Sequence, residues 1–206
     1  MKKTLLWALI SAFTFTVSVQ AADLEKQIVK DAKKEAKALK KQGWQVLPGA
    51  LPLERQLEDV YRKQYDRDEL GQSKFIIGVA QPTAGSIDAG RLQAQSLCHV
   101  SIAQQCSAQL KGIVELAVAN KQLTPEEAVT VSEVTAKSTE LITARLGRTV
   151  PLMECWKKTD SGNVQMLVRM GYPTTRALEE AKEVVREQLE EELKDLSEKL
   201  ERISFK

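Results

Sequence analysis

The sequence is poor in the residues that most enzyme and metal sites need. It has one histidine, His99, and three cysteines among 206 residues, which excludes a multi-histidine metal site within one chain. It also lacks a Gly-x-Ser-x-Gly turn, a phosphate-binding glycine loop and zinc-type cysteine spacing. Cys98 and His99 are neighbours on a predicted helix, so their side chains diverge by about 100° and form no dyad. We expect no catalytic site, no cofactor and no metal.

Aromatic residues and net charge are also scarce. Aromatic residues make up 5% of the chain, and the formal net charge is +2. A balance so close to neutral argues against a nucleic-acid partner held by bulk charge. The 43% of apolar residues can supply a core, and the abundance of Ala, Leu, Glu, Lys and Gln is typical of a helix-rich protein.

The N-terminus has the pattern of a secretory signal peptide over residues 1–21. Two lysines precede an apolar run over 5–19, and small residues end the segment before a cut between Ala21 and Ala22. A membrane anchor is the alternative, but the run is short for a span of about 20 residues. No cysteine precedes Cys98, so no lipid attachment is expected. We expect a mature chain without a transmembrane segment, in the periplasm or exported to the outer envelope and associated with the outer membrane.

The first mature segment, 23–42, has the period of a helix that ends at Gly43. Lysines fill its non-apolar faces, which suits either a solvated face or one that binds anionic lipid or cell-wall polymer. Removal of the two lysines in the signal would leave 28 basic and 28 acidic residues. This balance gives little support to electrostatic attachment to a membrane.

Further elements follow from local signals. Pro52 can open a short helix, and residues 75–80 read as a strand in which Gly78 lets another backbone approach closely. A long helix is expected over 88–120. Thr124 and Glu127 form a capping box that opens the next helix, which we expect to reach about residue 141.

The C-terminal third predicts two strands and a long helix. Strands are expected over 149–158 and 164–172, and a helix from Thr174 or Thr175 almost to the C-terminus. Its apolar seam suits a coiled coil or an amphipathic helix packed on its own domain. The final turns extend past a small sheet, so they should meet the N-terminal helix, a second copy or another protein. The residues of this candidate interaction seam are Leu193, Leu196, Leu200 and Ile203.

The three cysteines restrict the possible disulfides. Cys98 and Cys106 are eight residues apart on one predicted helix, about 12 Å by helical rise. This exceeds the roughly 7 Å that a disulfide can bridge, so only Cys155 can pair with one of them. The alternative is three small buried hydrophobic residues.

One group of aromatic residues is a candidate pocket. Trp44, Tyr61 and Trp156 would together favour binding of a small apolar or glycan ligand between helix and sheet.

Four segments in the middle of the chain carry a family resemblance. They are Phe75-Ile-Ile-Gly-Val-Ala, the Ala-rich helix from Ala89, Val150-Pro-Leu-Met-Glu-Cys-Trp and Val164-Gln-Met-Leu-Val-Arg. Over roughly 74–173 the chain resembles the small envelope lipoproteins typified by a twenty-kilodalton surface lipoprotein, and the related N-terminal domain of the flagellar-ring protein FlgT. The resemblance implies a compact α+β domain without a catalytic site to transfer.

The mature chain as a whole is also similar to uncharacterised exported proteins of Bacteroides-type bacteria, especially from Gly43-Trp44 to Glu54. It differs from the lipoproteins in lacking the lipidated cysteine.

These observations predict an α+β fold. We expect a small, mainly antiparallel three-stranded sheet packed by the long central helix and the long C-terminal helix, with an N-terminal helical extension. The expected division is a signal peptide (1–21), a helical segment (22–73) and an α+β envelope-protein domain (74–206). The expected function is that of a non-enzymatic cell-envelope protein that acts as a scaffold, accessory or interaction subunit by binding an envelope protein or itself. The alternative is a periplasmic carrier of a small apolar or glycan ligand.

Overall fold

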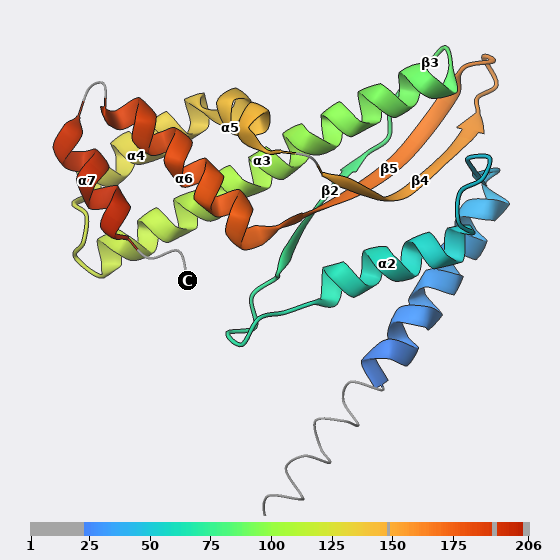
Figure 1. Cartoon of the computed structure of the whole chain (residues 1–206), viewed down its shortest axis with the longest axis horizontal. Helices are drawn as coiled ribbons and strands as arrows, with labels where there is room; N and C mark the ends of the chain where they lie inside the picture. Colours follow the sequence, from blue (N-terminus) through green and yellow to red (C-terminus); the bar gives the residue numbers. More distant parts are fainter. Residues whose placement is uncertain (1–22, 148, 191–192, 204–206) are drawn as a thin grey trace, which may run out of the picture.

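The fold is an antiparallel sheet enclosed by helices (Figure 1). The computed structural model describes residues 23–147, 149–190 and 193–203, so the predicted signal peptide and its cut at Ala21 and Ala22 lie outside the described residues. The strands are β1 (Gln45–Val46), β2 (Phe75–Ala80), β3 (Thr83–Ala84), β4 (Val150–Lys158) and β5 (Val164–Pro173). Their order is β1-β4-β5-β2, with β3 also paired to β5.

The α+β class is confirmed, whereas the predicted number of three strands is corrected to five. The additional strands β1 and β3 have two residues each, which is too short for an alternating pattern to show in the sequence. The strands β4 and β5 lie close to the ranges predicted for them, 149–158 and 164–172, and they pair antiparallel with a register shift between Pro151 and Met153.

The long helix α3 (Ile87–Ala119) covers one face of the sheet. Its packing on β2 is close, because a Cβ on Gly78 would lie 2.5 Å from the carbonyl oxygen of Cys98. The predicted role of Gly78 as a point of close approach is therefore confirmed. The core on this side is formed by small and medium side chains of α3 with residues of β2 and β5; they include Ile76, Ala94, Cys98, Ile102, Met166, Val168, Met170 and Tyr172.

The first helix, residues 23–41, and α2 (Leu53–Tyr65) cover the opposite face (Figure 1). Their buried residues pack against β4 and β5 in one cluster that includes Ala32, Ala36, Leu53, Leu57, Val60, Met153, Cys155 and Leu167. The N-terminal helices are therefore a layer of the fold, where an extension was expected. Both faces of β5 are covered for this reason.

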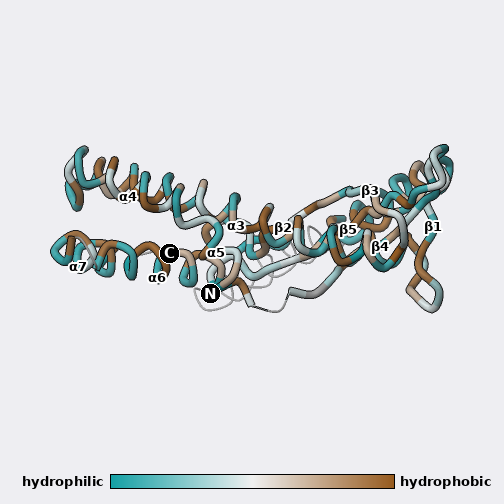
Figure 2. Tube along the Cα trace, turned by 90° about the horizontal axis from the view of Figure 1, so that it is seen from above, coloured by the Kyte–Doolittle hydropathy of each residue, from teal (hydrophilic) through white to brown (hydrophobic). Residues whose placement is uncertain are grey.

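The remaining helices form a bundle at the end of α3 that lies away from the strands (Figure 2). They are α4 (Pro125–Lys137), α5 (Thr139–Arg145), α6 (Thr174–Glu190) and α7 (Lys194–Arg202). The capping box is confirmed: the Thr124 hydroxyl accepts from the backbone N–H of Glu127, and the Glu127 carboxylate accepts from that of Thr124. The helix it opens ends at Lys137, earlier than predicted, and α5 follows.

The predicted single C-terminal helix is corrected to two helices, α6 and α7. Leu196, Leu200 and Ile203 are buried against α3, α4 and α6, while Leu193 is exposed. The seam is therefore satisfied within the chain, and its partners are these helices, where the N-terminal helix was one expectation. The spacing of apolar residues is the same in one long helix and in two helices that fold back, so the sequence does not distinguish them.

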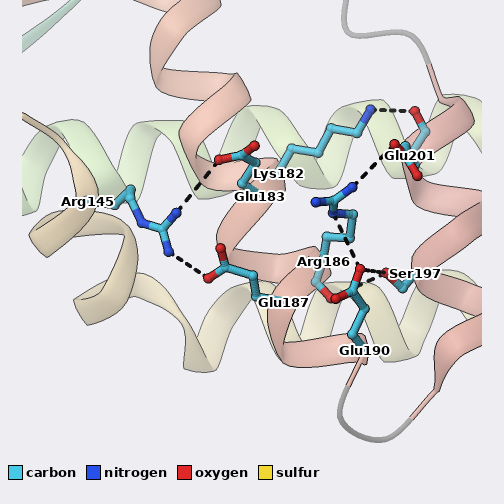
Figure 3. A network of polar contacts seen from close by, with 8 residues as sticks. All are labelled: Arg145, Lys182, Glu183, Arg186, Glu187, Glu190, Ser197 and Glu201. Atoms are coloured by element: carbon cyan, nitrogen blue, oxygen red, sulfur yellow. Dashed lines mark hydrogen bonds and ion pairs between the residues drawn. The ribbon is translucent and has the colours of Figure 1, made fainter.

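Polar contacts fix this fold-back (Figure 3). The Lys182 ammonium donates to the carbonyl oxygens of Glu201 and Ile203, at 2.8 and 3.0 Å. Arg186 pairs with the Glu201 carboxylate at 3.3 Å, and Arg145 joins α5 to α6 through Glu187 at 2.6 Å.

Among the residues that the structure describes, no helix is both long and apolar enough to cross a bilayer.

Candidate functional site

Three polar side chains from distant parts of the chain meet on the face that the first helix and α2 cover. Arg169 of β5 donates from Nη1 to Glu35 Oε2 at 3.2 Å, and from Nη2 to Oε1. The Tyr61 hydroxyl of α2 donates to Glu35 Oε2 at 2.8 Å. A carboxylate that accepts from a guanidinium and a hydroxyl is held firmly, because bonds to charged groups are the stronger ones.

The surroundings of this network are partly dry. Burial, reinforced by the bond to Glu35, raises the pKa of Tyr61 to about 12, so its hydroxyl stays protonated and keeps donating. The Tyr61 ring also stacks on Tyr65, with ring centroids 5.8 Å apart. Arg169 Nε is buried and has no hydrogen-bond partner among the described residues. An unsatisfied buried N–H is costly and often marks a functional position.

An open groove of about 510 Å³ lies over this network, between β2 and α2. Phe75, Ile77 and Val79, which share one face of β2, line its side, and Glu35, Tyr61 and Arg169 contribute the polar part of its lining. The Lys63 ammonium lies 4.0 Å from the centre of the Phe75 ring, where α2 passes over β2. The groove thus combines an apolar strand face with a fixed polar cluster.

The groove is bordered by the free edge of the sheet, since β2 is the last strand in the order. The carbonyl of Ile77 accepts a bond from the Gln105 amide at 3.0 Å, which shows that Ile77 turns its backbone away from β5. In an antiparallel strand every second residue is turned the same way, so Val79 also directs its N–H to the outer edge. The Ser73 hydroxyl caps the carbonyl of Phe75 at 2.9 Å.

A second hollow, of about 630 Å³, lies between the loop over 67–74 and the start of α6. It is lined mainly by side chains of this loop, such as the exposed Glu69 and Leu70, and by Thr174, Thr175 and Leu178 of α6. Volume alone favours this hollow, whereas convergent polar groups and backbone donors favour the groove at β2.

The structure separates the residues of the predicted disulfide. Cys98 and Cys106 lie in the core under α3, whereas Cys155 lies in the core under α2, with the sheet between them. All three are buried and free, so Cys155 pairs with neither. Burial raises the pKa of Cys98 to about 11 and those of Cys106 and Cys155 to about 12, which makes them inert thiols at neutral pH.

The structure also separates the residues of the predicted aromatic pocket. Trp44 and Tyr61 pack under the first helix and α2, while Trp156 packs on the α3 side of the sheet. Because the sheet lies between them, Trp156 does not form one pocket with Trp44 and Tyr61. Around Gly78 the backbone and side chains of α3 are in direct contact with β2, in the space between helix and sheet where the alternative prediction places a ligand.

The histidine is a packing residue. His99 Nε2 lies 2.5 Å from the Thr149 hydroxyl, and burial lowers the pKa of His99. The described residues contain no group of three or more His, Cys, Asp or Glu side chains placed to hold a metal ion.

Glu35 and Arg169 were missed by the sequence analysis. They are separated by 134 positions, and each stands in a segment whose charged residues are ordinarily solvated. The one available signal was Arg169 itself, a charged residue in the middle of an apolar strand. Arg169 becomes part of an enclosed network only because both faces of β5 are covered. The alternation of polar and apolar residues along the strand does not indicate this cover.

Comparison with known proteins adds no assignment: no protein-family model, no curated protein and no solved structure matches this chain. The resemblance to envelope lipoproteins therefore stays a prediction.

Proposed function

We propose that the protein is a non-enzymatic, exported cell-envelope protein that binds an extended segment of another envelope protein in the groove along β2. The observation that supports this most is the free β2 edge beside a groove with a fixed polar network. An edge strand offers a row of backbone donors and acceptors, and an extended peptide can pair with it as a further strand.

The geometry defines how such a segment would bind. The N–H groups of Ile77 and Val79 point to the outer edge, where they can donate to carbonyls of the incoming strand. The Gln105 side chain is exposed, so it can swing away from the Ile77 carbonyl and release that acceptor. Each of these main-chain bonds is independent of sequence, and the groove supplies the selectivity.

The lining of the groove predicts the residues that the segment would carry. Side chains alternate along a strand, so every second residue of the ligand would face the groove. These residues would contact the apolar faces of Ile77 and Val79 and the ring of Tyr61. We expect apolar residues at alternate positions of the segment, with a polar residue where the Arg169 side chain lines the groove.

The test is a comparison of two substitutions at Val79, which is 48% exposed. Peptides of about twelve residues are selected from a random display library on the exported protein, and the strongest is titrated by fluorescence anisotropy. Val79→Pro removes the outward N–H and sets a ring against the edge, so affinity should fall at least about tenfold. Val79→Thr keeps the N–H and the branched shape, and should bind as the parent does.

Circular dichroism melts of both variants establish that the fold is retained. Selection of no peptide above background, or equal affinity of the Val79→Pro and Val79→Thr variants, would contradict the proposal.

A further inference from the structure

The first helix sorts its charges by face, although the chain as a whole is near neutral. Three of its four acidic residues lie outside the arc of the lysines, and two of these pair with other elements of the fold: Glu25 with Arg62 of α2, and Glu35 with Arg169 of β5. Asp31 accepts from the Gln27 amide at 2.8 Å on the same helix. The contacts of Glu25 and Glu35 thus turn two of the four carboxylates toward the body of the protein, and only Asp23 lies on the side of the lysines.

The lysines of this helix lie on the other side. With about 100° between successive residues, seven of them fall within an arc of about 120°, which lies roughly opposite the buried stripe of Ile28, Ala32, Ala36 and Leu39. All seven are exposed; they are Lys26, Lys30, Lys33, Lys34, Lys37, Lys40 and Lys41. We call this surface the lysine face. Along the axis it extends over about 22 Å.

Most of the positive charge on the lysine face is uncompensated. Lys26 pairs with Asp23 at 3.5 Å, and Lys40 with Glu54 at 2.6 Å. Within the described part of the chain the other five lysines make no ion pair. The near balance of 28 basic and 28 acidic residues in the expected mature chain therefore hides a local excess. The total charge alone gives little support to electrostatic attachment to a membrane. The local excess of positive charge on the lysine face supports it.

We propose that the lysine face binds the phosphate-bearing surface of an anionic phospholipid bilayer. The face is a convex row of long, flexible ammonium groups and borders none of the hollows described above, so it suits an extended plane better than a small ligand. An anionic leaflet attracts lysines that come within about one Debye length, roughly 8–10 Å at physiological salt. The apolar stripe of this helix is buried in the fold, so the helix lies on the bilayer without inserting.

This orientation leaves the groove at β2 accessible. Glu35, which lines the groove, is on the side of the first helix turned away from the lysine face by about 160°. A chain held at a membrane surface by its lysines would therefore still present the β2 edge to a partner. The proposal does not depend on peptide binding, since it rests on a different surface.

The test is sedimentation of the protein with vesicles of phosphatidylcholine, with or without phosphatidylglycerol. The lysine-face variant carries Lys30→Glu, Lys33→Glu and Lys37→Glu. A matched control carries Lys111→Glu, Lys137→Glu and Lys158→Glu, which are exposed positions elsewhere and change the net charge equally. Each lysine at an anionic surface contributes about fivefold to binding, so the lysine-face variant should lose at least about 100-fold.

The expected result is binding of the parent and the control to phosphatidylglycerol vesicles, weakening steeply as salt is raised, with no binding to pure phosphatidylcholine. Circular dichroism melts and titration with the selected peptide verify that the lysine-face variant is folded. Equal losses in the two triple variants, undiminished binding by the lysine-face variant, or parent binding to neutral vesicles would each overturn the proposal. Binding of the parent to inorganic phosphate or to peptidoglycan, without binding to anionic vesicles, would also overturn the proposal.

Discussion

Replacing Gly78 with alanine tests whether α3 packs on the sheet as closely as the structure shows. An added Cβ would lie 2.5 Å from the Cys98 carbonyl oxygen and 2.9 Å from Ile102 Cγ1. The oxygen belongs to the backbone of α3, so the clash is relieved only if the whole helix shifts from β2. Over-packing of a core ordinarily costs 1–3 kcal/mol, and a rigid obstacle places this variant near about 3 kcal/mol.

In a chain of this size 1 kcal/mol corresponds to about 2–4 °C, so the melting temperature of the Gly78→Ala variant should fall by roughly 6–12 °C. Thermal and urea unfolding followed by circular dichroism measure this change. Gly112→Ala in α3 is the control, because a Cβ at that position would meet no atom within 4 Å apart from its chain neighbours and the nearby backbone of its own helix. It should gain up to about 1 kcal/mol from helix propensity. A Gly78→Ala protein as stable as the parent would refute the close packing of α3 on β2.

Two further predictions concern the bundle and the buried thiols. Leu200→Ser should lower the free energy of unfolding by about 2–5 kcal/mol, because Leu200 is fully buried within the chain, and the mass in light scattering should not change. Leu193 is exposed, so Leu193→Ser should cost little. Loss of a dimer with unchanged stability would show instead that the seam joins two copies. The thiols Cys98, Cys106 and Cys155 should react with a disulfide reagent only after unfolding. Because their folded pKa values of about 11 to 12 exceed the unfolded value near 9.0, stability should be complete below pH 9 and decline as pH rises toward 12. Rapid labelling of the native protein, or stability that is flat across this range, would contradict their burial.

Local signals in the sequence predicted local structure well. The capping box at Thr124 and Glu127 marks the start of α4, and the strands predicted over 149–158 and 164–172 lie close to β4 and β5. Gly78 predicted close packing, because a glycine inside a strand often marks a place where another backbone approaches closely. These features depend on residues within a few positions of one another.

Features that depend on distant residues were not predicted. The fold-back of α7 on α6 brings Lys182 to the carbonyl oxygens of Glu201 and Ile203, while the apolar spacing continues through both helices unchanged. The groove was missed for the same reason: Glu35 and Arg169 acquire their meaning only when β5 is covered by the first helix. Total charge likewise carried no information on how the lysines are distributed in space.

The two proposals together describe a protein that lies on an anionic membrane surface and holds a partner by strand addition. The lysine face provides attachment, and β2, on the other side of the first helix, provides the binding edge. Each can fail without the other, since Val79→Pro leaves the lysines intact and the lysine-face variant leaves β2 intact.

Hydrogen exchange at single amides of β2 tests the central claim most directly. The N–H groups of Ile77 and Val79 point to the outer edge, whereas those of Ile76 and Gly78 face β5. Adding the selected peptide should slow exchange strongly at the amides of Ile77 and Val79. At Ile76 and Gly78, which are already bonded to β5, exchange should slow only by the amount that follows from the higher global stability of the complex. A peptide that binds with saturation but leaves the Ile77 and Val79 amides exchanging as in the free protein would contradict strand addition at β2.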